Sequence, residues 1–452
     1  MYCLVEVHTM KRTIDEHLLA WKSDRDRLVL LFRGARQVGK TYSIRQLGTS
    51  FKHYLEVNFE ERPRLADFFK GDLSATVICE KLAAFHGVQI IPGETLLFFD
   101  EIQACPACLR ALRFFKEQMP DLHVIAAGSM LELVLGGMSS FGVGRIASLH
   151  MYPLSFREFL IAEGAVSLES YIFSRVDPQP VDEAFHALLL DKLRVYMMIG
   201  GMPAVVASYV VNRDIRRCQE LLDSLLQSLW TDFAKYTESC PVLVLRDTFW
   251  SVARQAGGKF IYSHVSPDCS RHMAKKAVDL LAQAHLVHPV VHTAAQGIPL
   301  GAQTDRNRFK ALPLDVGLHQ RMLGLDLSAQ LLASDLDLVN KGSLAEVFVG
   351  LELAAGASPL LKPQLFYWHR EAAGSSAEVD YVIQRNEHIV PIEVKAGSRG
   401  AMQSMHRFMA ERNSPLGLRL SHENVGRYKG ILALPLYLAG MLPRELSLSP
   451  DN

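Results

Sequence analysis

The sequence predicts an α/β protein of several domains, with a parallel-sheet core near its N-terminus. Three observations support this prediction. Apolar segments of strand length occur at residues 28–32, 95–99 and 122–127, helix-compatible segments separate them, and glycine, serine or carboxylate residues follow each one. At 452 residues the chain is also too long for one ordinary core, so we expect roughly three or four domains.

The composition indicates a soluble, globular chain without bulk affinity for polyanions. Hydrophobic residues make up 49% of the chain, and 48 Lys and Arg balance 48 Asp and Glu. A nucleic-acid site would therefore have to be a local patch. No apolar stretch reaches the roughly 18 residues of a membrane span, and the N-terminus lacks the apolar centre of a signal peptide. We therefore expect a cytoplasmic protein without a membrane partner. Met10 is a second candidate start, in which case residues 1–9 would be dispensable.

The first functional motif links the apolar segment 28–32 to a helix-compatible segment at 43–47. It reads Gly34-Ala35-Arg36-Gln37-Val38-Gly39-Lys40-Thr41, which is the spacing of a phosphate-binding loop. The two glycines permit backbone conformations closed to other residues, so successive N–H groups can point at one anion. Lys40 would reach the terminal phosphates, and the Thr41 hydroxyl would hold Mg²⁺. The order of strand, loop and helix therefore predicts a site for ATP.

Adjacent carboxylates supply the second motif. Asp100 and Glu101 follow the apolar segment 95–99, which would deliver them to the sheet edge where ligands of open α/β sheets collect. Asp100 would bind Mg²⁺, often through water, and Glu101 would polarise the water that attacks the γ-phosphate. The next predicted strand, residues 122–127, delivers Ser129 to the same edge. There it is either a sensor of the γ-phosphate or a plain turn serine.

These motifs resemble those of a known family. The segments 33–41, 99–103, 127–129 and 152–159 look like those of bacterial and archaeal AAA-type (AAA_14-like) ATPases with a C-terminal domain of unknown function, DUF4143. This family is related to archaeal and STAND-type ATPases. The resemblance extends from Met10 onward and implies a P-loop NTPase core at residues 1–165. It makes Arg145 a candidate to contact phosphate, in its own chain or from a neighbouring subunit, or else a surface arginine before a strand.

Residues 166–240 read as a helical lid. The turn at the end of one predicted helix is similar to the Gly-Gly-x-Pro turn in the lid of related STAND and archaeal ATPases. This resemblance implies that Gly201 and Pro203 bring backbone close to the nucleotide base. The same residues would be explained equally well if they only ended the helix.

Residues 241–325 look like a winged helix, with helices at 245–256 and 270–284. Lys275 and Lys276 lie on the second of these helices. They would meet the phosphates of a nucleic acid or simply face solvent, and the sequence leaves both alternatives open.

The last domain, residues 326–452, carries a third set of charged residues. Glu346 lies in an otherwise apolar helix, while Asp380 and the pair Glu393 and Lys395 lie on strand-like segments. This arrangement resembles the PD-(D/E)xK nuclease fold, which implies that Asp380, Glu393 and Glu346 hold Mg²⁺. Lys395 would stabilise charge or orient water. Charged alternation on a solvated strand explains the same letters, and nuclease-like folds also serve as binding modules that do not cut.

We therefore predict a Mg²⁺-dependent ATPase that couples ATP binding and hydrolysis to the binding or processing of DNA or RNA. The winged helix and the C-terminal domain would contact the nucleic acid, and the protein could be an oligomer. The alternative is a STAND-like regulatory switch whose nuclease-like domain binds without cutting. A third hypothesis is a scaffold for which ATP is only a folding ligand, and the presence of Glu101 argues against it.

Overall fold

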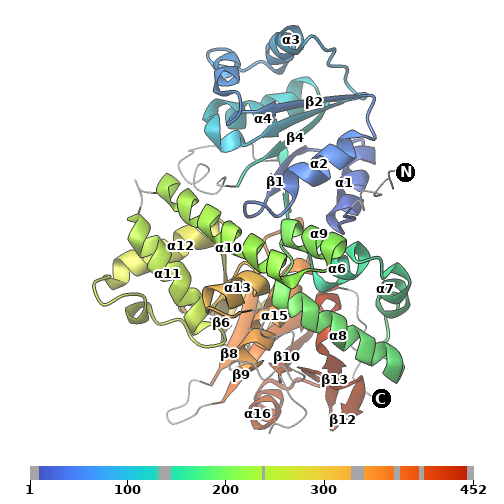
Figure 1. Cartoon of the computed structure of the whole chain (residues 1–452), viewed down its shortest axis with the longest axis vertical. Helices are drawn as coiled ribbons and strands as arrows, with labels where there is room; N and C mark the ends of the chain where they lie inside the picture. The colour runs from blue at the N-terminus through green and yellow to red at the C-terminus, as the bar shows by residue number, and fades with distance from the viewer. Residues whose placement is uncertain are drawn as a thin grey trace.

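The protein, described here by a computed structural model, contains two β-sheets with helices between them (Figure 1). The described residues are 10–129, 131, 144–236, 240–326, 341–370, 377–395 and 402–444. A five-stranded sheet lies at one end of the molecule and an eight-stranded sheet at the other. The helices α9 (Pro203–Asn212) and α10 (Ile215–Asp232) lie between them, and α8 (Glu183–Ile199) lies beside the second sheet.

The first sheet is entirely parallel, with the strand order β2-β3-β4-β1-β5. Its strands are β1 (Val29–Arg33), β2 (His53–Asn58), β3 (Thr95–Asp100), β4 (His123–Ala127) and β5 (Ile146–His150). Every residue of β3 and β4 is buried, as expected for central parallel strands covered on both faces. The predicted parallel-sheet core is confirmed, and β1, β3 and β4 lie within one residue of their predicted positions.

Helices cover both faces of this sheet because side chains alternate along each strand. Leu30 of β1 belongs to the same apolar cluster as residues of α1 (Ile14–Ser23) and α2 (Lys40–Gly48). Its neighbour Leu31 belongs to a second cluster, which contains residues of α3 (Ala75–His86) and α4 (Pro106–Gln118). The result is a three-layer core in which the phosphate-binding loop joins β1 to α2.

Helices also dominate the segment that follows the core. Ser155 caps α6 (Phe156–Ala162) with a capping box, in which Glu158 N–H donates to the Ser155 hydroxyl and the Glu158 carboxylate accepts from Ser155 N–H. The other helices are α7 (Val166–Phe173), α11 (Val242–Gln255), α12 (Arg271–Gln283) and α13 (Val316–Met322). Helices α11 and α12 agree with those predicted at 245–256 and 270–284.

The second sheet is mixed, with the strand order β12-β13-β11-β10-β9-β8-β6-β7. Strand β6 runs parallel to β8, and Val290 pairs with Leu365. The strands of the segment predicted as a winged helix therefore lie in the same sheet as those of the C-terminal segment. The strands are β6 (Val287–Thr293), β7 (Thr304–Pro313), β8 (Leu365–His369), β9 (Glu378–Arg385), β10 (His388–Val394), β11 (Gly417–Ser421), β12 (Gly426–Tyr428) and β13 (Ile431–Pro435).

Two helices, α15 (Lys341–Ala355) and α16 (Gln403–Arg412), pack against the second sheet. Short 3₁₀ helices complete the described elements: η1 (Pro63–Phe69), η2 (Ile102–Ala104), η3 (Phe233–Tyr236), η4 (Tyr262–His264), η5 (Leu300–Gln303) and η6 (Leu436–Met441). Within the described ranges, none of the helices is both long enough and apolar enough to cross a membrane.

Candidate active site

The phosphate-binding loop has the backbone that its glycines were expected to permit. Gly34 has φ of 147° and Gly39 has φ of 103°, both in the region that favours glycine. A Cβ on Gly34 would lie 2.3 Å from the carbonyl oxygen of Met151, so a side chain cannot fit there. Helix α2 begins at Lys40, directly after the loop, and its first N–H groups have no partner within the helix. The loop therefore presents N–H groups and a positive helix end to an anion.

Lys40 lies folded back over the loop. Its ammonium donates to the carbonyl oxygens of Gly34 at 2.9 Å and Ala35 at 2.7 Å, and the side chain is buried. Burial lowers the pKa of Lys40 to about 8, against the opposing charges of Glu101 and Asp100. A triphosphate would offer this ammonium anionic oxygens in place of neutral carbonyl oxygens, which is a stronger interaction.

Thr41 and Asp100 meet beside the loop. The Thr41 hydroxyl donates to Asp100 Oδ2 at 3.1 Å, and the Asn58 amide donates to the same oxygen at 3.3 Å. Burial and the charge of Glu101 raise the pKa of Asp100 to about 6. A hydroxyl and a carboxylate are the oxygen donors that Mg²⁺ prefers, so the residues present fit this ion.

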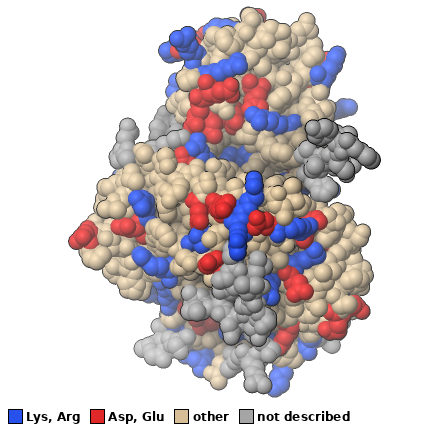
Figure 2. Space-filling model, viewed as in Figure 1, with Lys and Arg blue, Asp and Glu red and all other residues tan. Residues whose placement is uncertain are grey.

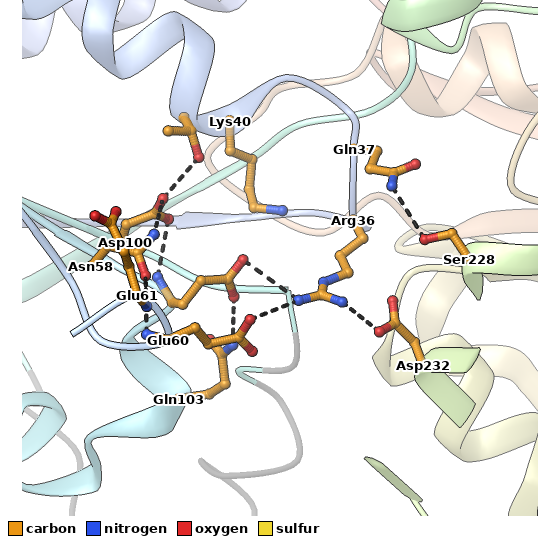
Figure 3. A network of polar contacts seen from close by, with 12 residues as sticks. Arg36, Gln37, Lys40, Asn58, Glu60, Glu61, Asp100, Gln103, Ser228 and Asp232 are labelled. Carbon is orange, nitrogen blue, oxygen red and sulfur yellow. Dashed lines mark hydrogen bonds and ion pairs between the residues drawn. The ribbon is translucent and has the colours of Figure 1, made fainter. Parts of the chain in front are cut away.

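Arg36 joins the loop to the carboxylates around it (Figure 3). Its guanidinium donates to Asp232, the last residue of α10, and to Glu60 Oε2 at 3.0 Å, and it lies 4.0 Å from Glu101 Oε1. The Gln103 amide donates to the other oxygen of Glu101 at 2.5 Å. Glu101, the carboxylate predicted to polarise the attacking water, thus lies between Gln103 and Arg36.

Helix α10 contacts the loop at a second point. The Gln37 amide donates to the Ser228 hydroxyl at 3.4 Å (Figure 3). Ser228 and Asp232 lie four residues apart, which places them on the same face of α10. One face of α10 therefore lies against the phosphate-binding loop.

Ser129 follows β4, as predicted, and its buried hydroxyl has no hydrogen-bond partner among the described residues.

Arg145 lies beside the start of β1, away from the phosphate-binding loop. Its carbonyl accepts from Val29 N–H at the start of β1, and its side chain pairs with Glu117 of α4 at 3.0 Å. The phosphate-binding loop follows the other end of β1, about 15 Å away at roughly 3.3 Å per residue. Contact of Arg145 with phosphate, in its own chain or from a neighbouring subunit, stays a prediction.

The Gly-Gly-x-Pro turn packs against protein on both sides. Gly201 N–H donates to Asp315 Oδ2 at 2.6 Å, and its carbonyl accepts from Leu154 N–H at 2.7 Å. A Cβ on Gly201 would lie 2.0 Å from the Leu154 carbonyl oxygen, so close backbone approach requires the glycine. Pro203 begins α9 and lies beside the loop, 3.7 Å from where a Cβ on Gly39 would be. Contact of Gly201 and Pro203 with a nucleotide base stays a prediction.

Two residues that support the loop were missed by the sequence analysis. Arg12 is buried and donates to the carbonyls of Val38 at 2.9 Å and Tyr152 at 2.8 Å, while its Nε lies 3.1 Å from Glu158. Glu158 also accepts from Thr13. The spacing of Ser155 and Glu158 is a capping-box signal, but no local pattern indicates that Arg12 reaches the loop.

A second charged cluster lies on the eight-stranded sheet and includes the residues predicted for a nuclease-like site. The ammonium of Lys310, on β7, donates to Glu346 Oε1 at 2.7 Å and lies 2.8 Å from Glu378 Oε1 and 3.6 Å from Asp380 Oδ1. Glu393 accepts from Lys395 at 2.6 Å. The predicted residues Glu346 and Asp380 thus meet at a lysine that the sequence analysis missed.

Burial and charge act against each other in this cluster. Burial alone would lower the pKa of Lys310, but the charges of Glu346, Asp380 and Glu378 raise it above its usual range. Burial and the charge of Asp380 raise the pKa of Glu393 to about 7. The neighbouring carboxylates therefore favour the charged form of Lys310.

The first sheet and its loop define a P-loop ATPase-like core. Comparison with family profiles agrees. Residues 26–160 match AAA_14, described as an AAA domain, residues 190–329 match a domain of unknown function (DUF8612), and residues 341–438 match a domain of unknown function (DUF4143). The chain therefore combines an AAA_14 domain with a C-terminal DUF4143 domain, which confirms the predicted resemblance.

Several solved structures are similar to the chain. A Walker-type ATPase of Pyrococcus abyssi, PABY2304, is 14% identical with a TM-score of 0.45, over 70% of this chain and 96% of that one. The Orc1 protein of Aeropyrum pernix in complex with DNA is 13% identical (TM-score 0.27, 74% and 95%). A STAND protein of Pyrococcus horikoshii is 9% identical (TM-score 0.26, 78% and 47%). The comparison with curated proteins gave no match.

Proposed function

We propose that the chain binds ATP with Mg²⁺ at the loop 34–41 and hydrolyses its terminal phosphoanhydride bond. The contact between Thr41 and Asp100, 3.1 Å long and adjacent to Lys40, is the observation that carries this proposal. These two oxygen ligands would hold Mg²⁺, which when bound neutralises charge on the β- and γ-phosphates. The AAA_14 match over residues 26–160 supports the same activity.

The residues of the loop would bind the phosphates, and Glu101 would act on water. Backbone N–H groups after Gly34 would donate to phosphate oxygens, and Lys40 would exchange two carbonyl oxygens for phosphate oxygens. Glu101 would accept a proton from the water whose oxygen attacks the γ-phosphorus. The bond between that phosphorus and the bridging oxygen would break, and ADP would leave with the bridging oxygen. Ser129 would donate to the γ-phosphate.

A titration with a fluorescent ATP analogue in the presence of Mg²⁺ tests the site. Lys40→Ala should weaken binding at least about tenfold, because it removes a charge-assisted contact in a buried site. The matched control is Lys52→Ala, at an exposed lysine that pairs with Glu94. Circular dichroism would show that both variants fold. If Lys40→Ala binds the analogue as tightly as the wild type, the loop is not the nucleotide site.

We also propose that nucleotide state controls the lid. The specific observation is that Arg36 and Gln37 of the loop contact Asp232 and Ser228 of α10. A phosphate entering the loop would compete with Asp232 for the guanidinium, so nucleotide binding and the position of α10 would be coupled. This contact favours the STAND-like switch as the second candidate function.

For nucleic acid, we propose a contact through helix α12. Its residues Arg271, His272, Lys275 and Lys276 are exposed, whereas Ala274, Ala277, Val278 and Leu281 are buried. On the face of the molecule in Figure 2, basic and acidic side chains are interspersed over the described residues. Because the chain as a whole is neutral, only a local group of cations, such as the one on α12, would attract the phosphates of DNA or RNA.

A further inference from the structure

Lys310 is the most deeply buried ammonium group in the cluster on the second sheet. It is 1% exposed and lies between residues from two different elements, with Glu346 on α15 and with Glu378 and Asp380 on β9. An isolated ammonium in such a place would be very costly, so the three carboxylates are what keeps it charged. The cluster is thus built around a cation that the chain itself supplies.

A metal ion would need the oxygens that this ammonium already uses. Of the three residues predicted as Mg²⁺ ligands, Glu346 and Asp380 face Lys310, and the second oxygen of Asp380 accepts from Val394 N–H at 2.8 Å. The third, Glu393, accepts from Lys395. Among the carboxylate oxygens of the cluster, Glu393 Oε2 is the one that is fully buried without a hydrogen-bond partner in the described part of the chain, and one such oxygen does not make a site for a divalent cation.

The balance of charge points the same way. The four carboxylates of Glu346, Glu378, Asp380 and Glu393 face three ammonium groups, those of Lys310, Lys395 and Lys259, the last of which lies 3.7 Å from Glu378. Little negative charge remains to attract Mg²⁺. Within the described ranges, no group of three or more His, Cys, Asp or Glu side chains is arranged to hold a metal ion.

We infer that Lys310 takes the place of a divalent cation in this cluster, so that the predicted nuclease-like site of the C-terminal segment binds no metal there. The cluster instead ties β7 to α15 and β9 through ion pairs. This inference concerns the second sheet and is independent of the proposed ATP site.

Binding of Mn²⁺, measured by electron paramagnetic resonance on the whole nucleotide-free protein, tests the inference. The wild type should show no site that depends on Asp380, so wild type and Asp380→Asn should bind equal amounts of Mn²⁺. Lys310→Met keeps the length of the side chain and removes the charge. It should gain one Mn²⁺ per chain, and Lys310→Met combined with Asp380→Asn should lose that ion again. Lys259→Met, at an exposed lysine near the same cluster, is the control and should gain none.

Thermal unfolding gives a second readout. Lys310→Met leaves buried carboxylates without their counter-ion, so its Tm should fall by about 10 °C and rise again when millimolar Mn²⁺ is added. The Tm of the wild type should not respond to Mn²⁺. The inference is overturned if the wild type binds an Mn²⁺ ion that Asp380→Asn removes, or if Lys310→Met gains neither the ion nor the Mn²⁺-dependent Tm. If Lys310→Met does not fold, the comparison of wild type with Asp380→Asn decides the question alone.

Discussion

Arg36 of the phosphate-binding loop and Asp232 of helix α10 form an ion pair between residues that lie 196 positions apart in the sequence. The same guanidinium contacts Glu60 and lies close to Glu101. Burial alone would lower the pKa of Arg36, but these three acids raise it above its usual range. One cation is therefore shared between the lid and the carboxylate that we propose orients water.

Removal of the Asp232 charge should strengthen ATP binding. Asp232→Asn would weaken the ion pair between α10 and Arg36, so that Arg36 could pair with phosphate instead. Because a partly buried ion pair is worth about 1 kcal/mol, we expect the Kd for ATP to fall by about three- to tenfold. Titration with a fluorescent ATP analogue measures this Kd. The control is Asp223→Asn, on the same helix, where the carboxylate pairs with Arg321 instead. Unchanged or weaker binding by Asp232→Asn would contradict a shared role for Arg36.

Glu101→Gln should separate binding from hydrolysis. The amide cannot accept the proton of the attacking water, so turnover of ATP should fall at least about 100-fold while ATP binding persists. Phosphate release and analogue titration measure the two quantities. Glu117→Gln, at an exposed acid paired with Arg145, should leave both unchanged. Wild-type turnover by Glu101→Gln would remove the role that we assign to this carboxylate.

Charge reversal on α12 tests the nucleic-acid proposal. Lys275→Glu combined with Lys276→Glu should weaken DNA binding and make it less dependent on salt, because fewer phosphate contacts release fewer counter-ions. The slope of log K against log salt should become shallower by about two. Arg216→Glu combined with Arg217→Glu, at exposed positions on α10, is the matched control. If affinity and slope stay at their wild-type values, these lysines only face solvent.

Glu352 should make the stability of the protein depend on pH. This buried carboxyl group of α15 accepts from Phe156 N–H at 2.8 Å, and burial raises its pKa to about 8. The folded protein therefore keeps a proton that the unfolded chain releases above about pH 4.5. The contribution of Glu352 to stability is fully present below that pH and is lost as the pH rises towards 8, by at most about 1.4 kcal/mol per pH unit.

Glu352→Gln removes this dependence. The variant should be about as stable as the wild type at pH 5 and more stable at pH 8, as measured by denaturant unfolding across that range. Glu80→Gln, at an exposed position on α3, should follow the wild-type curve. Parallel curves for Glu352→Gln and the wild type would show that the buried carboxyl group does not hold a proton.

The sequence predicted the parts of the protein whose signals are local. The loop from Gly34 to Thr41 and the pair Asp100 and Glu101 each lie directly after an apolar strand, and the structure brings Thr41 and Asp100 together. Arg12, Asp232 and Lys310 could not be predicted, because each meets its partners only after distant segments fold together. A lysine inside an alternating strand has no sequence pattern that identifies it as buried.

The sequence also did not predict which strands belong to the second sheet. The two helices of the segment 241–325 have clear periodicity, and the sequence analysis assigned this segment to a domain of its own. Pairing between β6 and β8 depends on residues about 75 positions apart, such as Val290 and Leu365. Hydrogen bonds between distant strands leave no trace in the pattern of a single sequence, because each strand alternates in the same way whichever neighbour it has.

The sheet that crosses residue 325 limits how this protein can be divided. A fragment that begins at residue 326 would lack β6 and would expose the N–H and C=O groups along the edge of β8, a surface that invites aggregation. It would also lack the lysine around which its carboxylates gather. The DUF8612 and DUF4143 segments are therefore expected to fold and unfold together, as one cooperative unit that two family models describe.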